Sequence, residues 1–133
     1  MNGEDRGDPE ALHRPAPFDR KSLQKILGGD GAAAAALLSA FARDVPGQLA
    51  RLHEALERNE TAQVRLMAHT LKGSLLWIGA EDAATAASLL ERAAAGEPGV
   101  SPREGLATLS RLVARVLIAI AIPPDDEVAA SRY

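Results

Sequence analysis

Apolar residues recur at three- and four-residue spacing along most of this chain, a pattern that predicts amphipathic helices. The clearest example runs from Val64 to Ala80. At about 100° per residue, one face of that helix collects Val64, Met67, Ala68, Leu71, Leu75 and Ile78. We expect this face to be buried. His69 falls on the opposite side, so the histidine should face solvent from the middle of a helix.

Two helices are expected before this one. A short helix over residues 20–27 has Asp19 as its candidate N-cap, and a longer one over about 32–58 has Asp30. The longer helix keeps helical spacing at Leu38, Phe41, Val45, Leu49, Leu52 and Leu56. Pro46 lies inside it and removes a backbone donor, so we expect a kink or a break into two near that position.

Two helices are expected after the central one, which should cover about 61–78. The first begins near Glu81, and its inward face would use Ala86, Leu89, Leu90 and Ala93. The last begins with a capping-box pattern, Ser101 followed by Glu104, with Pro102 at the first helical position. Its core face would use Leu106, Leu109, Val113, Val116, Leu117 and Ile120.

No segment alternates with the period of a strand, so the predicted fold class is all-α. We expect an antiparallel four-helix bundle over residues 18–122, with the short additional N-terminal helix across one end. Residues 1–17 read as a flexible arm, and residues 123–133 should fray. The apolar run 116–122 is too short for a membrane anchor and fits a buried final helix.

Composition narrows the classes of function. The 133-residue chain is 47% hydrophobic, enough for one domain with a single core. Aromatic residues make up only 3% and the formal net charge is -3, which argues against a nucleic-acid partner. The chain has no cysteine, which excludes disulfides and thiolate chemistry. Neither a signal peptide nor a membrane-spanning stretch is evident, so we expect a cytoplasmic monomer without a membrane partner.

The residues around His69 carry a chemical signal. Gly73 costs a helix interior roughly 1 kcal/mol relative to alanine. Because helical side chains lean toward the N-terminus, a side chain at position 73 would lie over the imidazole, and glycine leaves the ring uncovered. Lys72 puts an ammonium beside the same ring. We interpret this set as an exposed nucleophile with open access and a cation for an incoming anion.

The motif His-Thr-Leu-Lys-Gly-Ser begins at His69, and Gly-Ala follows at 79–80. It resembles the signature of histidine-containing phosphotransfer (HPt) domains, four-helix bundles that shuttle a phosphoryl group between receiver aspartates in multistep phosphorelays. The resemblance covers about residues 18–122. It implies that His69 accepts the phosphoryl group, that Lys72 stabilises charge and that Gly73 provides access.

The resemblance also implies a reaction and its partners. Neutral imidazole presents a lone pair, so we expect Nε2 of His69 to attack a receiver's aspartyl phosphate in a reversible step. The receiver would bring Mg²⁺ and its own lysine, and this chain would need no cofactor or metal of its own. The chain would be a phosphocarrier without an ATP site or kinase activity. Its partners would be response-regulator receiver domains, a hybrid sensor histidine kinase, or both.

An apolar rim around the histidine predicts where such a partner docks. Leu76 lies almost in line with His69, whereas Leu66 and Trp77 lie nearer the edge, where packing against adjacent helices is an equal alternative. Glu91, on the following helix, matches a polar position that often lies near the histidine in the family. We assign docking roles to Arg65, Leu66, Leu76, Trp77 and Glu91.

Two other hypotheses stay open. One is a non-catalytic helical interaction module whose motif is vestigial. The other is the phosphotransfer domain of a chemotaxis-type histidine kinase; that group tends to have Lys-Gly-Gly and an aromatic before the closing glycine, where this chain has Ser74 and Ile78. A metal site is not expected at His13 or His53, and the glycine-rich stretch 28–31 lacks the Lys-Ser/Thr of a phosphate-binding loop.

Overall fold

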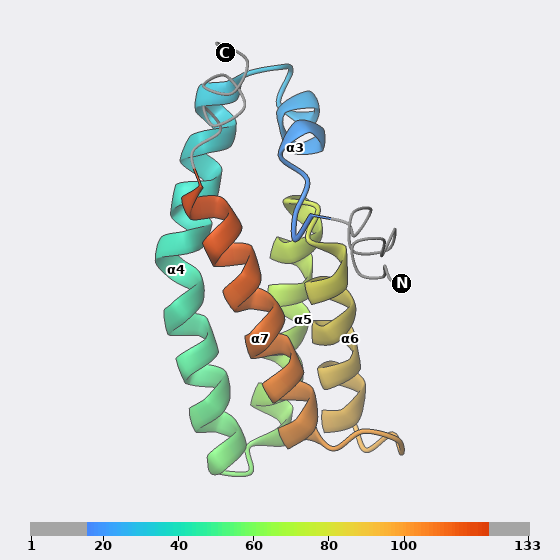
Figure 1. Ribbon diagram of the computed structural model, residues 1–133. Helices are drawn as coiled ribbons and strands as arrows, with labels where there is room; N and C mark the ends of the chain where they lie inside the picture. The colour runs from blue at the N-terminus through green and yellow to red at the C-terminus, as the bar shows by residue number, and fades with distance from the viewer. Residues whose placement is uncertain (1–15, 123–133) are drawn as a thin grey trace, which may run out of the picture.

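The described part of the chain is helical throughout. The computed structural model describes residues 16–122, which contain five helices and no strand, as the sequence pattern predicts (Figure 1). The helices are α3 Arg20–Ile26, α4 Gly31–Glu57, α5 Thr61–Trp77, α6 Glu81–Ala94 and α7 Pro102–Ala121. The predicted arm and frayed tail fall mainly on residues 1–15 and on 123–133, outside the described residues.

Side-chain caps explain where two of the longer helices begin. Asp30 Oδ1 accepts the backbone N–H of Ala33 at 2.9 Å at the start of α4. At the start of α7, the Ser101 hydroxyl accepts the N–H of Glu104, and the Glu104 carboxylate accepts the N–H of Ser101. These are the two halves of the predicted capping box. Both sequence signals for a helix start are therefore confirmed.

Of the kink or break into two expected near Pro46, the break is absent, because α4 is one continuous helix from Gly31 to Glu57. Pro46 is exposed on the outer side of α4, while Val45 beside it is buried. A proline inside a helix costs about 3 kcal/mol. Burying one large apolar side chain returns about 1.5–3 kcal/mol. Leu38, Val45 and Leu52 are all buried on one face of α4, so continuing the helix outweighs the local cost.

The four longer helices lie side by side, and successive helices run in opposite directions (Figure 1). Both α5 and α7 pack against α4 and α6. α3 meets α4 at a bend of 118° and turns back along its first part. This places α3 at the end of the molecule where α5 passes into α6 (Figure 1).

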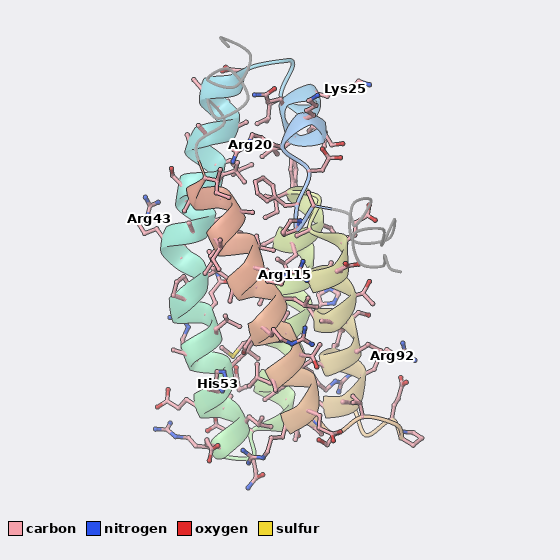
Figure 2. All side chains as sticks on the ribbon, viewed as in Figure 1. Arg20, Lys25, Arg43, His53, Arg92 and Arg115 are labelled. Carbon is pink, nitrogen blue, oxygen red and sulfur yellow. The ribbon has the colours of Figure 1, made fainter. Side chains whose placement is uncertain are left out.

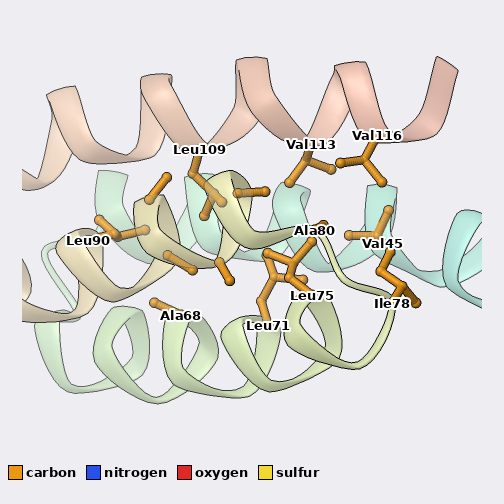
Figure 3. Close-up of a cluster of buried hydrophobic side chains, with 14 of the residues drawn as sticks. Val45, Ala68, Leu71, Leu75, Ile78, Ala80, Leu90, Leu109, Val113 and Val116 are labelled. Carbon is orange, nitrogen blue, oxygen red and sulfur yellow. The ribbon is translucent and has the colours of Figure 1, made fainter. Parts of the chain in front are cut away.

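A shared apolar core fixes the orientation of α5. Its predicted inner face is buried at Val64, Ala68, Leu71, Leu75 and Ile78, and Met67 is partly buried. Figure 3 shows several of these side chains directed into the space between the helices, together with Val113 and Val116 of α7. No polar or charged residue is buried within residues 16–122. The side of α5 that carries His69 must therefore face outward.

The inner face of α6 differs from the prediction at one position. Ala86, Leu90 and Ala93 are buried as expected, but Leu89 is 43% exposed. α6 packs against both α5 and α7 through a face rich in small residues: Ala83, Ala84, Ala86, Ala87, Leu90 and Ala93. Leu89 lies about 100° around the helix axis from Leu90, beyond the edge of that face. Alanines, not Leu89, let α6 approach its neighbours closely.

The apolar run 116–122 at the end of α7 is less buried than the sequence predicts, because Ile118 is 66% exposed and Ile122 is 49% exposed. Leu106, Leu109, Val113 and Val116 are buried, and Leu117 and Ile120 are partly buried against the core. Taken singly, none of the helices within residues 16–122 is long and apolar enough to cross a bilayer.

α3 is joined to the turn between α5 and α6. Asp19, its N-cap, donates its backbone N–H to the Ile78 carbonyl at 3.1 Å. The Asp19 carboxylate accepts hydrogen bonds from the hydroxyl and backbone N–H of Ser22, which lower the pKa of the Asp19 carboxyl below its usual value. Gly79 has φ of +76°, and a Cβ at that position would lie 2.8 Å from the Asp19 Cβ. Glycine is therefore required where the two segments meet.

Candidate functional site

His69 occupies the middle of α5 and presents its ring to solvent. The apolar residues of α5 bury the opposite side of the helix, which leaves the His69 side chain 61% exposed. An exposed ring can meet a partner without any opening of the bundle. His53 on α4 (Figure 2) is also exposed, but its Nε2 lies 3.2 Å from the Ser110 hydroxyl of α7.

The Glu91 carboxylate contacts both His69 and Lys72, the two polar side chains predicted to form the site. Glu91, on α6, places Oε2 at 3.1 Å from His69 Nδ1 and Oε1 at 3.4 Å from Lys72 Nζ. The Lys72 and Glu91 side chains are each 27% exposed, so this part of the cluster is half-buried between α5 and α6. An ionised carboxylate can only accept, so in this hydrogen bond the proton sits on Nδ1 of His69. In a neutral ring, Nε2 then carries the free lone pair.

Gly73 lies one turn after His69, and the space around it is open. A Cβ built at Gly73 would meet no neighbouring heavy atom within 4 Å. The bundle therefore imposes no packing requirement for glycine at this position. A longer side chain at position 73 would instead lie over the His69 ring, one turn earlier in the helix.

The other predicted site residues lie in two different settings. Arg65 is exposed, and three apolar side chains of α5 are largely exposed: Leu66 at 61%, Leu76 at 56% and Trp77 at 57%. They lie on the outward side of α5, outside the core, and Trp77 also lines grooves that α5 forms with α4 and α3. Glu91 is instead turned toward His69 and Lys72, so its contacts favour a positioning role over a docking one.

Two grooves flank Trp77, and neither was predicted. One, of about 440 Å³, lies between α4 and α5 and includes Phe41, Val45 and Ser74 in its lining. The other, of about 570 Å³, lies between α3 and the turn that joins α5 to α6, and it includes Ile26. Periodicity identifies the exposed face of one helix, but it does not say which neighbouring helix forms the opposite wall.

Within residues 16–122, no group of three or more potential ligands is arranged to hold a metal ion.

A comparison with protein families identifies the domain. The family model described as the Hpt domain matches residues 36–119, well over half of the chain. The chain belongs to the Hpt domain family. His69, Lys72, Gly73 and Glu91 all lie within the matched region of this Hpt domain, whereas α3 lies before it. Comparisons with curated proteins and with solved structures gave no match.

Membership of the family gives the general class of function. Hpt domains take part in phosphotransfer in phosphorelays, and they generally interact with receiver domains and kinases. The resemblance inferred from the His-x-x-Lys-Gly-Ser motif is thus confirmed at the level of the family.

Proposed function

We propose that this Hpt domain accepts a phosphoryl group on His69 from the aspartyl phosphate of one receiver domain and passes it to the aspartate of another. The observation that carries the proposal is the hydrogen bond between His69 Nδ1 and Glu91. It supports an Nδ1-protonated ring whose Nε2 lone pair points away from α6, toward the side from which a partner can approach.

The transfer step follows from that ring. The Nε2 lone pair forms a bond to phosphorus, and the bond from phosphorus to the aspartyl oxygen breaks in line with it. The bonding electron pair leaves with the aspartate carboxylate. Nδ1 keeps its proton, so the phosphorylated ring is cationic, and the Glu91 carboxylate at 3.1 Å offsets that charge. The reverse sequence delivers the phosphoryl group to the next receiver.

Lys72 and the receiver both compensate negative charge on the transferring phosphoryl group. Three equatorial oxygens of the transferring group need compensating charge. The Lys72 ammonium, held by Glu91 at 3.4 Å, supplies positive charge from this chain. The receiver supplies Mg²⁺, which neutralises phosphoryl oxygens on its own side. In this proposal Gly73 keeps the approach clear.

The unit that performs the transfer is residues 18–122, with α4 to α7 as the antiparallel four-helix bundle of the family. Receiver domains, alone or as part of a hybrid sensor histidine kinase, dock on the outward side of α5. The exposed Leu66, Leu76 and Trp77 provide apolar contact on that side, and Arg65 provides a charge.

Transfer from a panel of purified receiver domains tests this function. Each receiver is phosphorylated with radiolabelled acetyl phosphate, freed of the small molecule and mixed with the full chain. We expect at least one receiver to transfer label that is acid-labile and base-stable. Absence of label from every receiver would favour an interaction module with a vestigial motif. Labelling only by a kinase domain and ATP would favour the chemotaxis-type alternative.

A further inference from the structure

The groove between α3 and the α5–α6 turn combines exposed hydrophobic side chains with acidic ones. Three of the exposed large hydrophobic side chains line it: Ile26 at 60% exposure, Leu76 at 56% and Trp77 at 57%. They come from two helices far apart in the sequence, α3 and α5. Exposed apolar side chains gathered around one hollow are typical of an interaction surface.

This groove is continuous with the proposed phosphotransfer site. Leu76 lies seven residues after His69, which is two turns of helix, or about 10 Å along the axis on the same face. An interface at the lower end of the standard size covers about 600 Å² on each partner. A receiver seated over His69 therefore extends over the near wall of the groove.

The rest of the groove has a negative charge. Three carboxylates are among its lining residues: Asp19 from the start of α3, and Glu81 and Asp82 from the first turn of α6. None of the described residues that line the groove is a lysine, arginine or histidine. An apolar wall beside an acidic rim is complementary to a hydrophobic residue that neighbours a cationic one.

Neither terminal segment of this chain, nor a second copy of it, has the positive charge that would complement the groove. Residues 1–15 contain four acidic and two basic residues, and residues 123–133 contain three acidic and one basic residue. A second copy of the chain has a formal net charge of -3. Either terminus or another copy would add negative charge beside negative charge, whereas a foreign cationic segment would not.

We infer that this groove selects the receiver partner by accepting a docking segment in which an apolar residue neighbours a lysine or arginine. The inference rests on the proposed function and adds a specificity determinant to it. α3 supplies the wall at Ile26 and lies before the matched region 36–119, so this chain builds the groove partly from outside the matched domain.

A charge reversal with a matched control tests the inference. Glu81→Lys places a cation in the groove at the N-terminal end of α6. Glu60→Lys makes the same charge change at the N-terminal end of α5, at the other end of the bundle. Each full-length protein is phosphorylated with potassium phosphoramidate, which needs no docking, and transfer is measured to the receiver that reacts fastest with the wild-type chain.

We expect Glu81→Lys to raise the KM for the receiver about tenfold with kcat unchanged, because like charges now face each other across the interface. Glu60→Lys should leave both constants unchanged. Raising the ionic strength should weaken binding to the wild-type chain more than binding to Glu81→Lys. Trp77 is the only tryptophan, so its fluorescence reports directly on occupation of this face. Ile26→Lys, on the α3 wall, provides a second variant if Glu81→Lys melts at a lower temperature.

Each other outcome overturns a defined part of the account. Equal KM values for Glu81→Lys and Glu60→Lys, with transfer intact, would overturn the groove and leave the proposed function standing. Failure of the phosphorylated wild-type chain to transfer to any receiver would instead overturn the proposed function. Tighter receiver binding after removal of residues 1–15 would assign the groove to that segment. Concentration-dependent sedimentation abolished by Glu81→Lys would assign it to a second copy.

Discussion

At the scale of single residues, His69 depends on two neighbours that act in different ways. Glu91 holds one ring nitrogen through a 3.1 Å hydrogen bond, and Gly73 leaves the approach to the ring free of side-chain atoms. In the proposed transfer, the first contact determines which ring nitrogen attacks phosphorus. The second determines whether a receiver can reach that nitrogen. Each contribution can be removed separately.

Removing the Glu91 carboxylate should change the tautomer of His69. In Glu91→Ala, Nδ1 loses its acceptor, so the fraction of Nδ1-protonated ring seen by ¹⁵N NMR should fall. A hydrogen bond to a charged group is worth about 1.5–3 kcal/mol. Its loss should slow transfer about tenfold or more. Glu91→Gln retains an amide oxygen that can accept and should recover part of both effects; identical ring spectra in all three proteins would contradict the positioning role.

Filling the space at Gly73 should separate stability from transfer. Gly73→Ala should stabilise the helix by up to about 1 kcal/mol, because alanine has a higher helix propensity and meets no neighbour within 4 Å. Transfer should nevertheless slow, and Gly73→Gln should slow it further. Urea denaturation and transfer from a phosphorylated receiver measure the two quantities. Equal transfer rates in the three proteins would mean that the glycine is not needed for access.

At the scale of elements, the position of α3 depends on its junction with the α5–α6 turn. Gly79→Ala should destabilise the chain by more than about 1 kcal/mol, since alanine there needs a left-handed backbone and approaches Asp19 at 2.8 Å. Gly96→Ala is the matched control, because Gly96 also has a positive φ, but a Cβ added there would meet no neighbouring atom within 4 Å. Urea denaturation should give the larger loss for Gly79→Ala. Equal losses would show that the contact with Asp19 contributes nothing.

At the scale of the whole molecule, the exposed side of α5 should bind partners without supporting the fold. Leu76→Asp should weaken receiver binding at least tenfold, because burying a leucine on contact is worth about 1.5–3 kcal/mol. Its melting temperature should change little, since the side chain is 56% exposed. Leu89→Asp alters an exposed leucine on α6 and should affect neither quantity. A large drop in the melting temperature of Leu76→Asp would contradict its placement outside the core.

Much of this architecture could be predicted from local signals. The capping box at Ser101 and the N-cap at Asp30 mark helix starts, and the period of α5 alone places His69 opposite the core. The errors lie where tertiary packing decides. Pro46 continues a helix because the buried face of α4 outweighs a local cost, and Leu89 is displaced from the core by the alanines of α6.

Only part of the candidate site could be predicted from the sequence. His69, Lys72 and Gly73 form a local motif, so their proximity follows from helical spacing. The bridge that Glu91 makes to both His69 and Lys72 depends on the register of α6 against α5, which periodicity does not specify. The groove at Ile26 depends on the 118° bend between α3 and α4.

The most direct test of the central proposal is the site of phosphorylation. The wild-type chain, His69→Gln and His53→Gln are each mixed with the same phosphorylated receiver, and the acid-labile label is quantified beside a melting curve. His53 serves as control because it is the other histidine within the bundle and its Nε2 lies beside Ser110. Substituting an exposed helix residue should change stability by under about 0.5 kcal/mol, so His69→Gln should remain folded. We predict full labelling of the wild-type chain and His53→Gln and none of His69→Gln; label retained by a folded His69→Gln protein would contradict the assignment.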